Sequence, residues 1–448
     1  MLMMNHRSWP GFPAGLRFNH FQIFGAIRHF IRQCAALPGP EKVTKMNIVI
    51  AGFGVAGATA AEIARKHNPR AYITLLSKEK DLFYYRTRLP EVVSGDVAPE
   101  KILVHPHKWY DERNIELRLG EYLTEVHVRE KIVRGSMGSR QQYDRLLLAV
   151  GAESNRPPFP GDKLDGVHAI RSLNDAWTLH YTAKGKKKAV LIGGGLLGLE
   201  LAYSLTKLGL TVTVLERDDR VLPRQTTEAS AALLKKQLGA LGLEFRLNVE
   251  ADRFEGAGKV ENVVLKDGSE IEAEIVLISA GVVPNLNLAT TLGLKTDRAI
   301  IVDEYLQTSL PDIYAAGDCA QYPGAVGGLW TTSRAQALVA GVNIAEQDQS
   351  ARKIYVPEPP SNFLKVAGID LVAVGNLDPA GQLKGVEASS DKAYRKVTLD
   401  QDNRLIGFTN VGTTQGNKEL NAALQAKKAL SGEALSGLTD LDFDFAKL

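Results

Sequence analysis

From residue 46 onward, short runs of apolar, β-branched residues alternate with segments of helical periodicity. Residues 48–51 predict a buried strand, a glycine-rich turn follows at 52–57, and residues 58–66 have the pattern of a helix. A further apolar run at 71–76 predicts a second strand. This order is typical of a βαβ unit in a parallel sheet.

The same order restarts near Lys188. A strand is predicted at 189–192, a turn at 193–198, a helix at 199–208 and a strand at 211–215. Two such units predict an α/β fold with two Rossmann-like domains.

Each turn has the spacing G-x-G-x-x-G between a strand and a helix. The first glycine makes the tight bend, the second lets a diphosphate approach the backbone, and the third lets the helix pack close to the strand. The diphosphate then lies at the helix N-terminus, where free N–H groups favour negative charge. The predicted binding glycines are Gly52, Gly54 and Gly57 in the first turn and Gly193, Gly195 and Gly198 in the second.

An acid about 20 residues after each turn is expected to accept hydrogen bonds from ribose hydroxyls. Glu216 ends the second strand of the second unit, which favours NADH over NADPH; the alternative is a solvated strand-end charge. In the first unit Ser77 ends the strand and Glu79 is the candidate.

The pattern changes after about residue 355. Short strands are predicted at 364–374, 394–399 and 404–411, followed by a helix at 418–429. These elements predict a small α+β domain at 356–430. The tail, 431–448, carries Asp440, Asp442 and Asp444 and is expected to be exposed.

Residues 1–45 form a basic leader with six basic residues and one acidic residue, which leaves 48 basic and 50 acidic residues in the rest of the chain. An amphipathic targeting or anchoring segment is one interpretation. A start codon placed too early, or a disordered leader, is the other, because Met46 directly precedes the first predicted strand.

Composition narrows the class of protein. An apolar content of 44% and a charged content of 23% are ordinary for a globular chain, and no run approaches the roughly 20 apolar residues of a membrane span. A net charge of +3 does not indicate nucleic-acid binding. Two cysteines, Cys34 and Cys319, exclude a disulfide framework and indicate a reducing, cytoplasmic location. No metal-binding spacing appears.

Residues 46–430 resemble the FAD-dependent pyridine nucleotide-disulfide oxidoreductase superfamily. Four segments carry the resemblance beyond the two turns: 143–152, 277–285, 313–318 with Thr308, and 329–336. It implies an NAD domain at 156–274 inserted in an FAD domain formed by 46–155 and 275–355. It further implies FAD and NADH as cofactors. The residues that the resemblance places at the domain crossovers or beside FAD are Ala149, Gly151, Gly281, Asp318, Trp330 and Gln336.

Within that superfamily, the run 84–91 (YYRTRLPE) is most similar to NADH:rubredoxin reductases and related NADH oxidases. The resemblance implies that Arg86 contacts FAD, although a solvated loop is the alternative. Ferredoxin reductases of oxygenase systems have a lysine where this chain has Glu91. The resemblance implies that Glu200 lies near the nicotinamide. The alternative is that its carboxylate only complements the dipole at the helix N-terminus.

No cysteine occurs at 58–100, where disulfide reductases of the superfamily carry their reactive sulfur. The resemblance therefore implies hydride transfer from NADH to FAD and then electron transfer to an external acceptor, such as the small redox protein rubredoxin. The alternatives are an NADH oxidase, the flavin subunit of a nitrite-reductase-like complex, and a flavin-binding regulatory protein. The oligomeric state is left open.

Overall fold

A computed structural model describes residues 45–448 except 324, 358–360, 367 and 379–380; the side chains of 325–326 and 361–366 are also outside the description. The chain divides into Met1–Lys45 and Met46–Leu448, and only the second unit is considered below. Both interpretations of the leader concern residues that lie almost entirely outside the described part.

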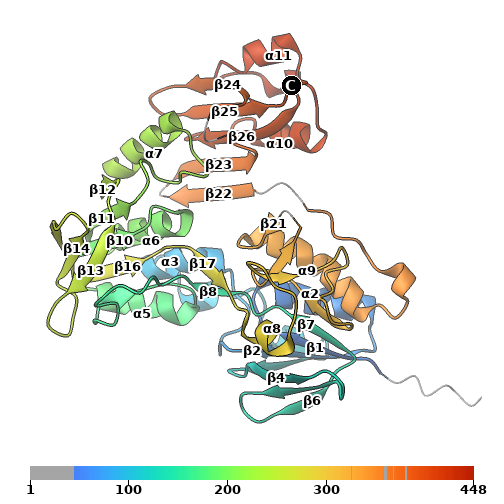
Figure 1. Cartoon of the computed structure of the whole chain (residues 1–448). Helices are drawn as coiled ribbons and strands as arrows, with labels where there is room; N and C mark the ends of the chain where they lie inside the picture. Colours follow the sequence, from blue (N-terminus) through green and yellow to red (C-terminus); the bar gives the residue numbers. More distant parts are fainter. Residues whose placement is uncertain (1–44, 324, 358–360, 367, 379–380) are drawn as a thin grey trace, which may run out of the picture. The chain divides into compact units, whose positions relative to one another are not determined.

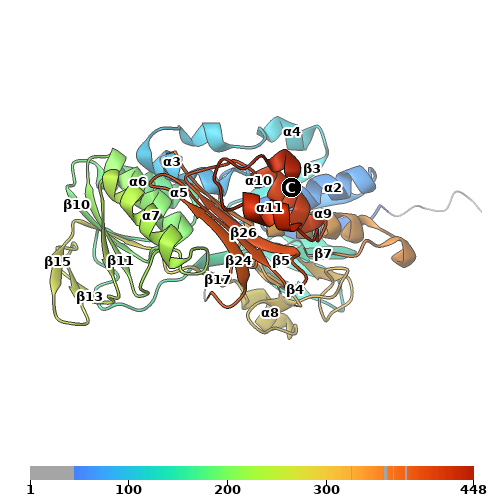
Figure 2. The same cartoon turned by 90° about the horizontal axis from the view of Figure 1, so that it is seen from above.

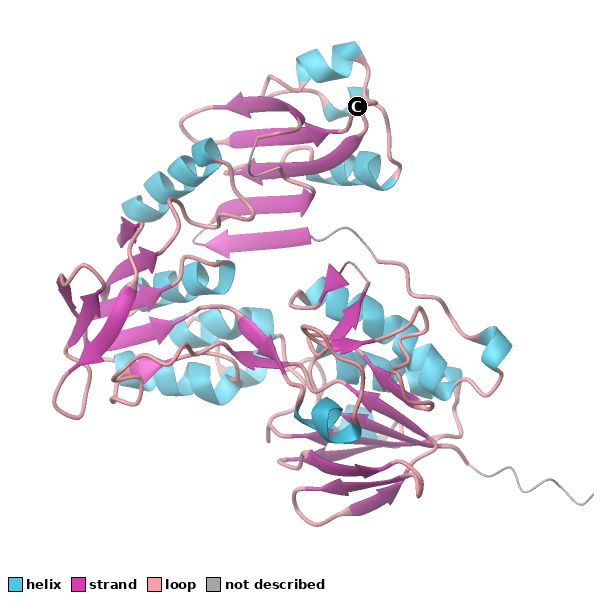
Figure 3. Ribbon diagram, viewed as in Figure 1, coloured by secondary structure: helices cyan, strands magenta, loops and turns pink. Residues whose placement is uncertain are grey.

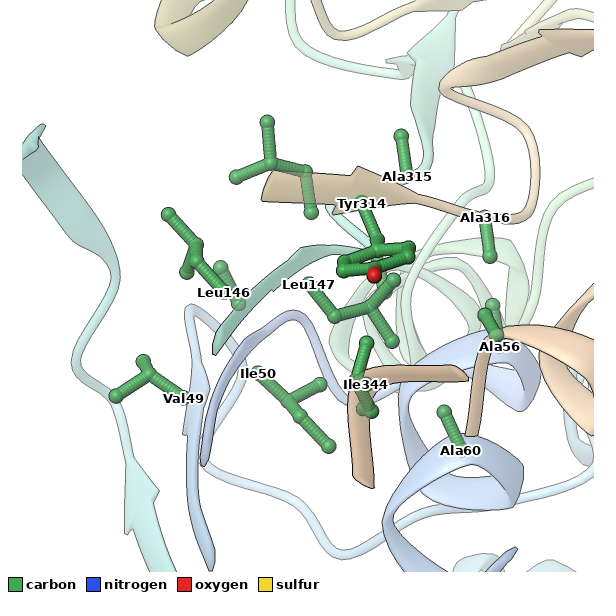
Figure 4. Close-up of a cluster of buried hydrophobic side chains, with 14 of the residues drawn as sticks. Val49, Ile50, Ala56, Ala60, Leu146, Leu147, Tyr314, Ala315, Ala316 and Ile344 are labelled. Atoms are coloured by element: carbon green, nitrogen blue, oxygen red, sulfur yellow. The ribbon is translucent and has the colours of Figure 1, made fainter. Parts of the chain in front are cut away.

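The first parallel sheet has the strand order β19-β7-β1-β2-β3. Helices α2 and α9 pack against each other beside it, so closely that a Cβ on Gly341 of α9 would lie 2.8 Å from the Ala60 carbonyl oxygen of α2. Ile50 and Leu147 lie on the helix side of this sheet, whereas Val49 and Leu146 lie on the other (Figure 4). The bounds are β1 (Asn47–Ala51), α2 (Val55–His67), β2 (Tyr72–Ser77), β3 (Ile115–Leu119), β7 (Arg145–Leu148), β19 (Ile313–Ala315) and α9 (Trp330–Ala345).

The second parallel sheet has the order β12-β11-β10-β16-β9 and repeats the first arrangement. Helices flank both sheets (Figure 3). The predicted strands and helices of both βαβ units are confirmed to within a few residues. The bounds are β9 (Val167–His168), α5 (Leu173–Ala183), β10 (Lys188–Ile192), α6 (Leu196–Lys207), β11 (Thr211–Glu216), α7 (Glu228–Ala240), β12 (Leu243–Leu247) and β16 (Ile275–Ile278).

The two crossovers between the sheets pair with each other. Strand β8 (Ala152–Ser154) runs antiparallel to β17 (Val282–Pro284), and they lie side by side (Figure 1). The Asn155 N–H donates to the Gly281 carbonyl, and the Asn285 N–H donates to the Gly151 carbonyl, both at 2.9 Å. Because β9 to β16 all lie between β7 and β19 in sequence, the second βαβ domain is inserted in the first, as the predicted fold class requires.

One segment of the first sequence half packs with the inserted domain. Tyr84, Leu89, Val92 and Ile102 are buried in the same cluster as Leu191, Leu199 and Ala202 of the second unit. The exact domain boundaries remain predictions.

Smaller elements complete the two nucleotide-binding halves. Two short antiparallel sheets have the orders β4-β5-β6 and β13-β14-β15, and a third, mixed sheet has the order β18-β20-β21. The bounds are η1 (Arg86–Arg88), α3 (Leu89–Ser94), η2 (Pro99–Ile102), α4 (His107–Asp111), β4 (Leu123–His127), β5 (Ile132–Gly135), β6 (Arg140–Gln142), β13 (Ala251–Glu255), β14 (Asn262–Leu265), β15 (Glu270–Glu272), α8 (Asn287–Leu292), β18 (Ile300–Ile301), β20 (Ala320–Tyr322), β21 (Ala325–Val326) and η3 (Gln349–Ala351).

The C-terminal part is an antiparallel sheet of order β22-β23-β26-β25-β24 with α7 on one side and α10 and α11 on the other (Figure 2). The prediction of one strand at 364–374 is wrong, because Gly368 takes a φ of +84° and the segment forms a hairpin of two strands. Strand β24 was not predicted, and the predicted helix ends at Gln425, since Lys427 adopts a left-handed conformation. The bounds are β22 (Ser361–Val366), β23 (Ile369–Gly375), β24 (Lys384–Ser389), β25 (Tyr394–Leu399), β26 (Leu405–Val411), α10 (Asn417–Gln425), α11 (Gly432–Gly437) and η4 (Phe445–Lys447).

The expectation of an exposed tail is wrong for its aromatic residues. Asp442 and Asp444 are exposed, but Phe443 and Phe445 between them are buried in the core beneath the C-terminal sheet. The buried Arg395 guanidinium donates to the carbonyls of 440 and 441 and lies 4.6 Å from the centre of the Phe445 ring. The tail is therefore part of the C-terminal fold.

Candidate nucleotide-binding sites

The first glycine turn is shaped by the backbone around it. Gly52 has a φ of +112°, and a Cβ there would lie 2.1 Å from the Ala149 carbonyl oxygen. A Cβ on Gly57 would lie 1.9 Å from the Gly52 oxygen, whereas a Cβ on Gly54 would meet nothing within 4 Å. Gly54 is also the N-cap of α2, which has no side-chain cap. The free N–H groups of this helix end therefore border open space.

The second turn repeats this geometry. Gly193 has a φ of +101° and faces the Ser279 carbonyl oxygen, 2.5 Å from a Cβ position; the third glycine, Gly198, is crowded by the Gly193 oxygen at 2.8 Å. Gly195, the N-cap of α6, has open space around it and no side-chain cap. Both turns fit a diphosphate, and in each the middle glycine is the one that a ligand would approach.

Glu216 is not a solvated strand-end charge. Its side chain is buried, Oε2 accepts from the Gly194 N–H at 2.8 Å, and Oε1 accepts from the Asp218 N–H at 3.1 Å. The carboxylate is thereby fixed beside the second turn. Its role toward a ribose remains a prediction.

Glu79 belongs to a network with the run that was singled out at 84–91. The Tyr84 hydroxyl donates to Glu79 Oε2 at 2.6 Å, and Arg86 Nη2 lies 2.8 Å from Oε1. The Arg86 side chain is 25% exposed, so the solvated-loop alternative does not hold for it. In the same run Arg88 and Glu91 form a more exposed pair at 2.6 Å.

Asp318 follows β19, and its side chain contacts the start of α9 and the segment before it. Its Oδ1 accepts from the Gly328 N–H at 3.0 Å and the Ser333 hydroxyl at 3.2 Å. Its Oδ2 forms an ion pair with Arg171 Nη2 at 2.7 Å. Sequence reasoning missed Arg171; the one local signal was its position directly before the capping box of α5, Ser172 and Asp175.

Trp330 begins α9 and stacks parallel to Phe83, with ring centres 5.7 Å apart; Tyr85 approaches it at the same distance. The two segments implied to lie beside a flavin are therefore in contact. Gln336 Oε1 accepts from the Gly317 N–H at 2.8 Å, while its buried Nε2 has no hydrogen-bond partner within residues 45–448 as described. This orphaned donor is compatible with a ligand nearby.

The remaining candidates take backbone or supporting positions. Ala149 is buried and forms the wall behind Gly52. Gly151 and Gly281 have φ values of +66° and +88° at the start of the paired crossovers. The Glu200 carbonyl accepts from Ser204, whose hydroxyl also donates to the Pro90 carbonyl at 2.7 Å, so α6 is tied to α3.

Cys319 is fully buried, and burial raises the pKa of its thiol to about 11. The thiol donates to the Leu148 carbonyl oxygen at 3.3 Å. Cys319 therefore packs rather than reacts, as predicted. In the part of the chain that the structure describes, no cluster of metal-ligating side chains and no helix long and apolar enough to cross a membrane is found.

Two parallel βαβ domains, one inserted in the other and each with an open glycine turn, define a two-dinucleotide α/β protein. The chain belongs to the pyridine nucleotide-disulphide oxidoreductase family, whose model matches residues 46–338. Residues 360–428 match the rubredoxin NAD+ reductase C-terminal domain. The predicted superfamily and fold class are thus confirmed.

Three similar proteins illustrate the relationship. The chain is 33% identical over 371 residues to rubredoxin-NAD(+) reductase from Ectopseudomonas oleovorans, covering 82% of this chain and 96% of the relative. It is 32% identical to the assimilatory nitrate reductase electron transfer subunit of Bacillus subtilis, covering 86% of this chain and 50% of the relative. The crystal structure of a ferredoxin reductase from Rhodopseudomonas palustris superimposes with a TM-score of 0.81 at 27% identity, covering 90% of this chain and 99% of that one. The chain thus spans about half the length of some curated relatives.

Proposed function

We propose that this chain is an FAD-dependent oxidoreductase that takes hydride from NADH and passes electrons to a small electron carrier of the rubredoxin type. The observation that carries the proposal is the pair of equivalent open turns at Gly54 and Gly195, each at an uncapped helix N-terminus. The match of the C-terminal residues to a rubredoxin reductase domain supports this choice of acceptor. A cytoplasmic location, where NADH is available, is part of the same proposal.

The first turn is assigned to FAD. The α2 N-terminus at Gly54 would hold its diphosphate, Glu79 and Asp318 would accept from its hydroxyl groups, and Arg86 would supply positive charge. Trp330 would cover one side of the ring system. Bound flavin supplies the hydride-accepting and electron-donating chemistry, and the protein supplies binding and orientation.

The second turn is assigned to NADH. The α6 N-terminus at Gly195 would hold the diphosphate, and the buried Glu216 would accept from the ribose and disfavour a 2′-phosphate. Glu200, the fifth residue of α6, would orient the nicotinamide. Because residues 58–100 contain no cysteine and Cys319 is buried, the reduced flavin would pass electrons directly to an external acceptor.

The alternative with specific support is the flavin component of a nitrate- or nitrite-reducing system. The similarity to the Bacillus subtilis electron transfer subunit covers 86% of this chain but only half of that protein. In that case the final acceptor of the electrons would be a metal centre of the nitrate- or nitrite-reducing system.

Anaerobic titration of the purified protein with NADH tests the proposal. The visible flavin absorbance should bleach with one equivalent of NADH, and multiple turnovers should require rubredoxin. Turnover with oxygen alone would instead indicate an NADH oxidase, and co-purification with a metal-bearing subunit would favour the nitrite-reductase-like alternative. A bound flavin that NADH does not reduce would refute the proposal and favour a regulatory role.

A further inference from the structure

The first turn of α5 is held by side chains from segments that lie far from it in the sequence. The Leu173 N–H donates to the Tyr84 hydroxyl oxygen at 3.0 Å, and Arg86 Nη1 donates to the Arg171 carbonyl. The Arg171 side chain reaches back to Asp318 Oδ2 at 2.7 Å. We call these contacts the α5 clasp; its side chains are Glu79, Tyr84, Arg86, Arg171 and Asp318.

The clasp is built on two carboxylates that are also the proposed FAD ligands. Glu79 accepts from both Tyr84 and Arg86, and Asp318 uses one oxygen for the Gly328 N–H and Ser333 and the other for Arg171. The Asp318 and Arg171 side chains are only 15% and 24% exposed, so solvent screens this ion pair weakly. Ligand hydroxyls that donate to these carboxylates would act on the same atoms that hold α5.

From the clasp, contacts continue to the second glycine turn. Ile170, just before Arg171, accepts from the Ser154 hydroxyl of the crossover ribbon at 3.2 Å. Strand β9, two residues earlier, pairs with β16, and β16 pairs with β10. Ser279 follows β16, and its carbonyl oxygen would lie 2.5 Å from a Cβ on Gly193, so the α5 start and the second turn are joined by one sheet.

We propose that Arg171 is a positioning residue that couples the two nucleotide sites, so that FAD bound at the first turn raises the affinity for NAD+ at the second. The inference rests on the proposed function. FAD hydroxyls would order Glu79 and Asp318, and the ordered carboxylates would hold Arg171 and α5. NAD+ binding would then cost less conformational entropy, because the domain that binds it is already ordered. Such a coupling is reciprocal, since NAD+ must then raise the affinity for FAD by the same factor.

Isothermal titration of the full-length chain with NAD+, with FAD bound and after its removal, measures this coupling without reducing the flavin. In the unaltered chain we expect FAD to tighten NAD+ binding by about fivefold or more. Arg171→Met should bring this ratio close to one, and Arg171→Lys should restore part of it by keeping the charge. Arg156→Met is the matched control, because that exposed arginine lies outside the clasp, donates to the carbonyl of Asp162 at 3.4 Å and should keep the full ratio.

A ratio in Arg171→Met equal to that of the unaltered chain would overturn the proposal, as would the absence of coupling in the unaltered chain. If Arg171→Met fails to fold by circular dichroism, Tyr84→Phe removes the hydroxyl that accepts from Leu173 and should lower the ratio; an unchanged ratio there would also overturn it. A chain that binds no FAD would refute the proposed function as well. If the chain binds both FAD and NAD+ but FAD does not change the affinity for NAD+, only the coupling is refuted and the proposed function stands.

Discussion

Gly54 and Gly195 differ from the other glycines of their turns in what surrounds them. Both have extended backbone at the helix N-cap, and a Cβ would meet no protein atom within 4 Å. Gly195→Ala should therefore cost at most about 1 kcal/mol of stability, the usual penalty for alanine at an N-cap. The added methyl group would occupy the diphosphate position, so NADH affinity should fall about tenfold (~1.4 kcal/mol) while FAD stays bound.

Gly198→Ala is the contrasting variant for this prediction. Its Cβ would lie 2.8 Å from the Gly193 oxygen, so overpacking should cost about 1–3 kcal/mol of stability. Thermal unfolding and NADH titration of both variants separate the two effects. Equal loss of stability in the two variants would contradict the assignment of Gly195 as the ligand-facing glycine.

Cys319 supplies a second test at this scale. Burial raises its thiol pKa to about 11, so the thiolate is scarce in the folded chain at pH 8. In a Cys34→Ser background, Ellman's reagent should label no thiol in the native protein and one after denaturation. The protonated thiol contributes its full stability to the fold below pH 9, the pKa of an unfolded cysteine. This contribution should decline as the pH rises from 9 through about 11, the pKa of Cys319 in the folded chain. Rapid native labelling at pH 8 would show that the thiol is accessible.

Elements whose signals are local could be predicted from the sequence, and elements fixed by distant contacts could not. Both βαβ units follow from an apolar run and a glycine turn within about 30 residues. The ion pair of Arg171 with Asp318 joins residues 147 positions apart, so no local pattern contains it. The hairpin at 361–375 was missed because residues 363–374 are mostly apolar and read as one strand; Gly368 marks the turn.

The C-terminal tail was misjudged because the prediction rested on its three aspartates, Asp440, Asp442 and Asp444, and not on the aromatic residues between them. Phe443 and Phe445 alternate with exposed aspartates, and this two-residue period carries the packing information. Phe445→Ala should destabilise the C-terminal fold by about 3 kcal/mol, since it removes a buried ring that also lies against the Arg395 guanidinium. Urea unfolding monitored by circular dichroism measures the change. Asp442→Ala, an exposed neighbour, should cost far less than Phe445→Ala, because it removes an electrostatic attraction to Arg395 and no buried apolar surface.

At the scale of the whole molecule, the C-terminal sheet divides its two faces between two cores. Leu371 and Ala373 of β23 are buried with Leu234 and Leu238 of α7, in the inserted domain. Val372 and Val374 of the same strand are buried with Phe408, α10 and the tail. Polar contacts reinforce the first face, where the Thr227 hydroxyl at the start of α7 donates to the Tyr394 hydroxyl at 2.9 Å. The C-terminal part should therefore contribute to the stability of the inserted domain.

This division predicts opposite patterns of hydrogen exchange for two neighbouring substitutions. Leu371→Ala leaves a cavity on the α7 side and should cost about 3 kcal/mol, with faster exchange of the α7 amides at 228–240. Val374→Ala leaves its cavity on the other side and should loosen mainly β26, α10 and the tail. Native-state hydrogen exchange by mass spectrometry measures the exchange of all these segments in each variant. If α7 kept its protection in Leu371→Ala, the C-terminal sheet would be a separate module whose stability does not depend on the inserted domain. Faster exchange in α7 would instead show that the two are coupled, because a change on the C-terminal sheet would reach the helix that packs against the strands of the inserted domain.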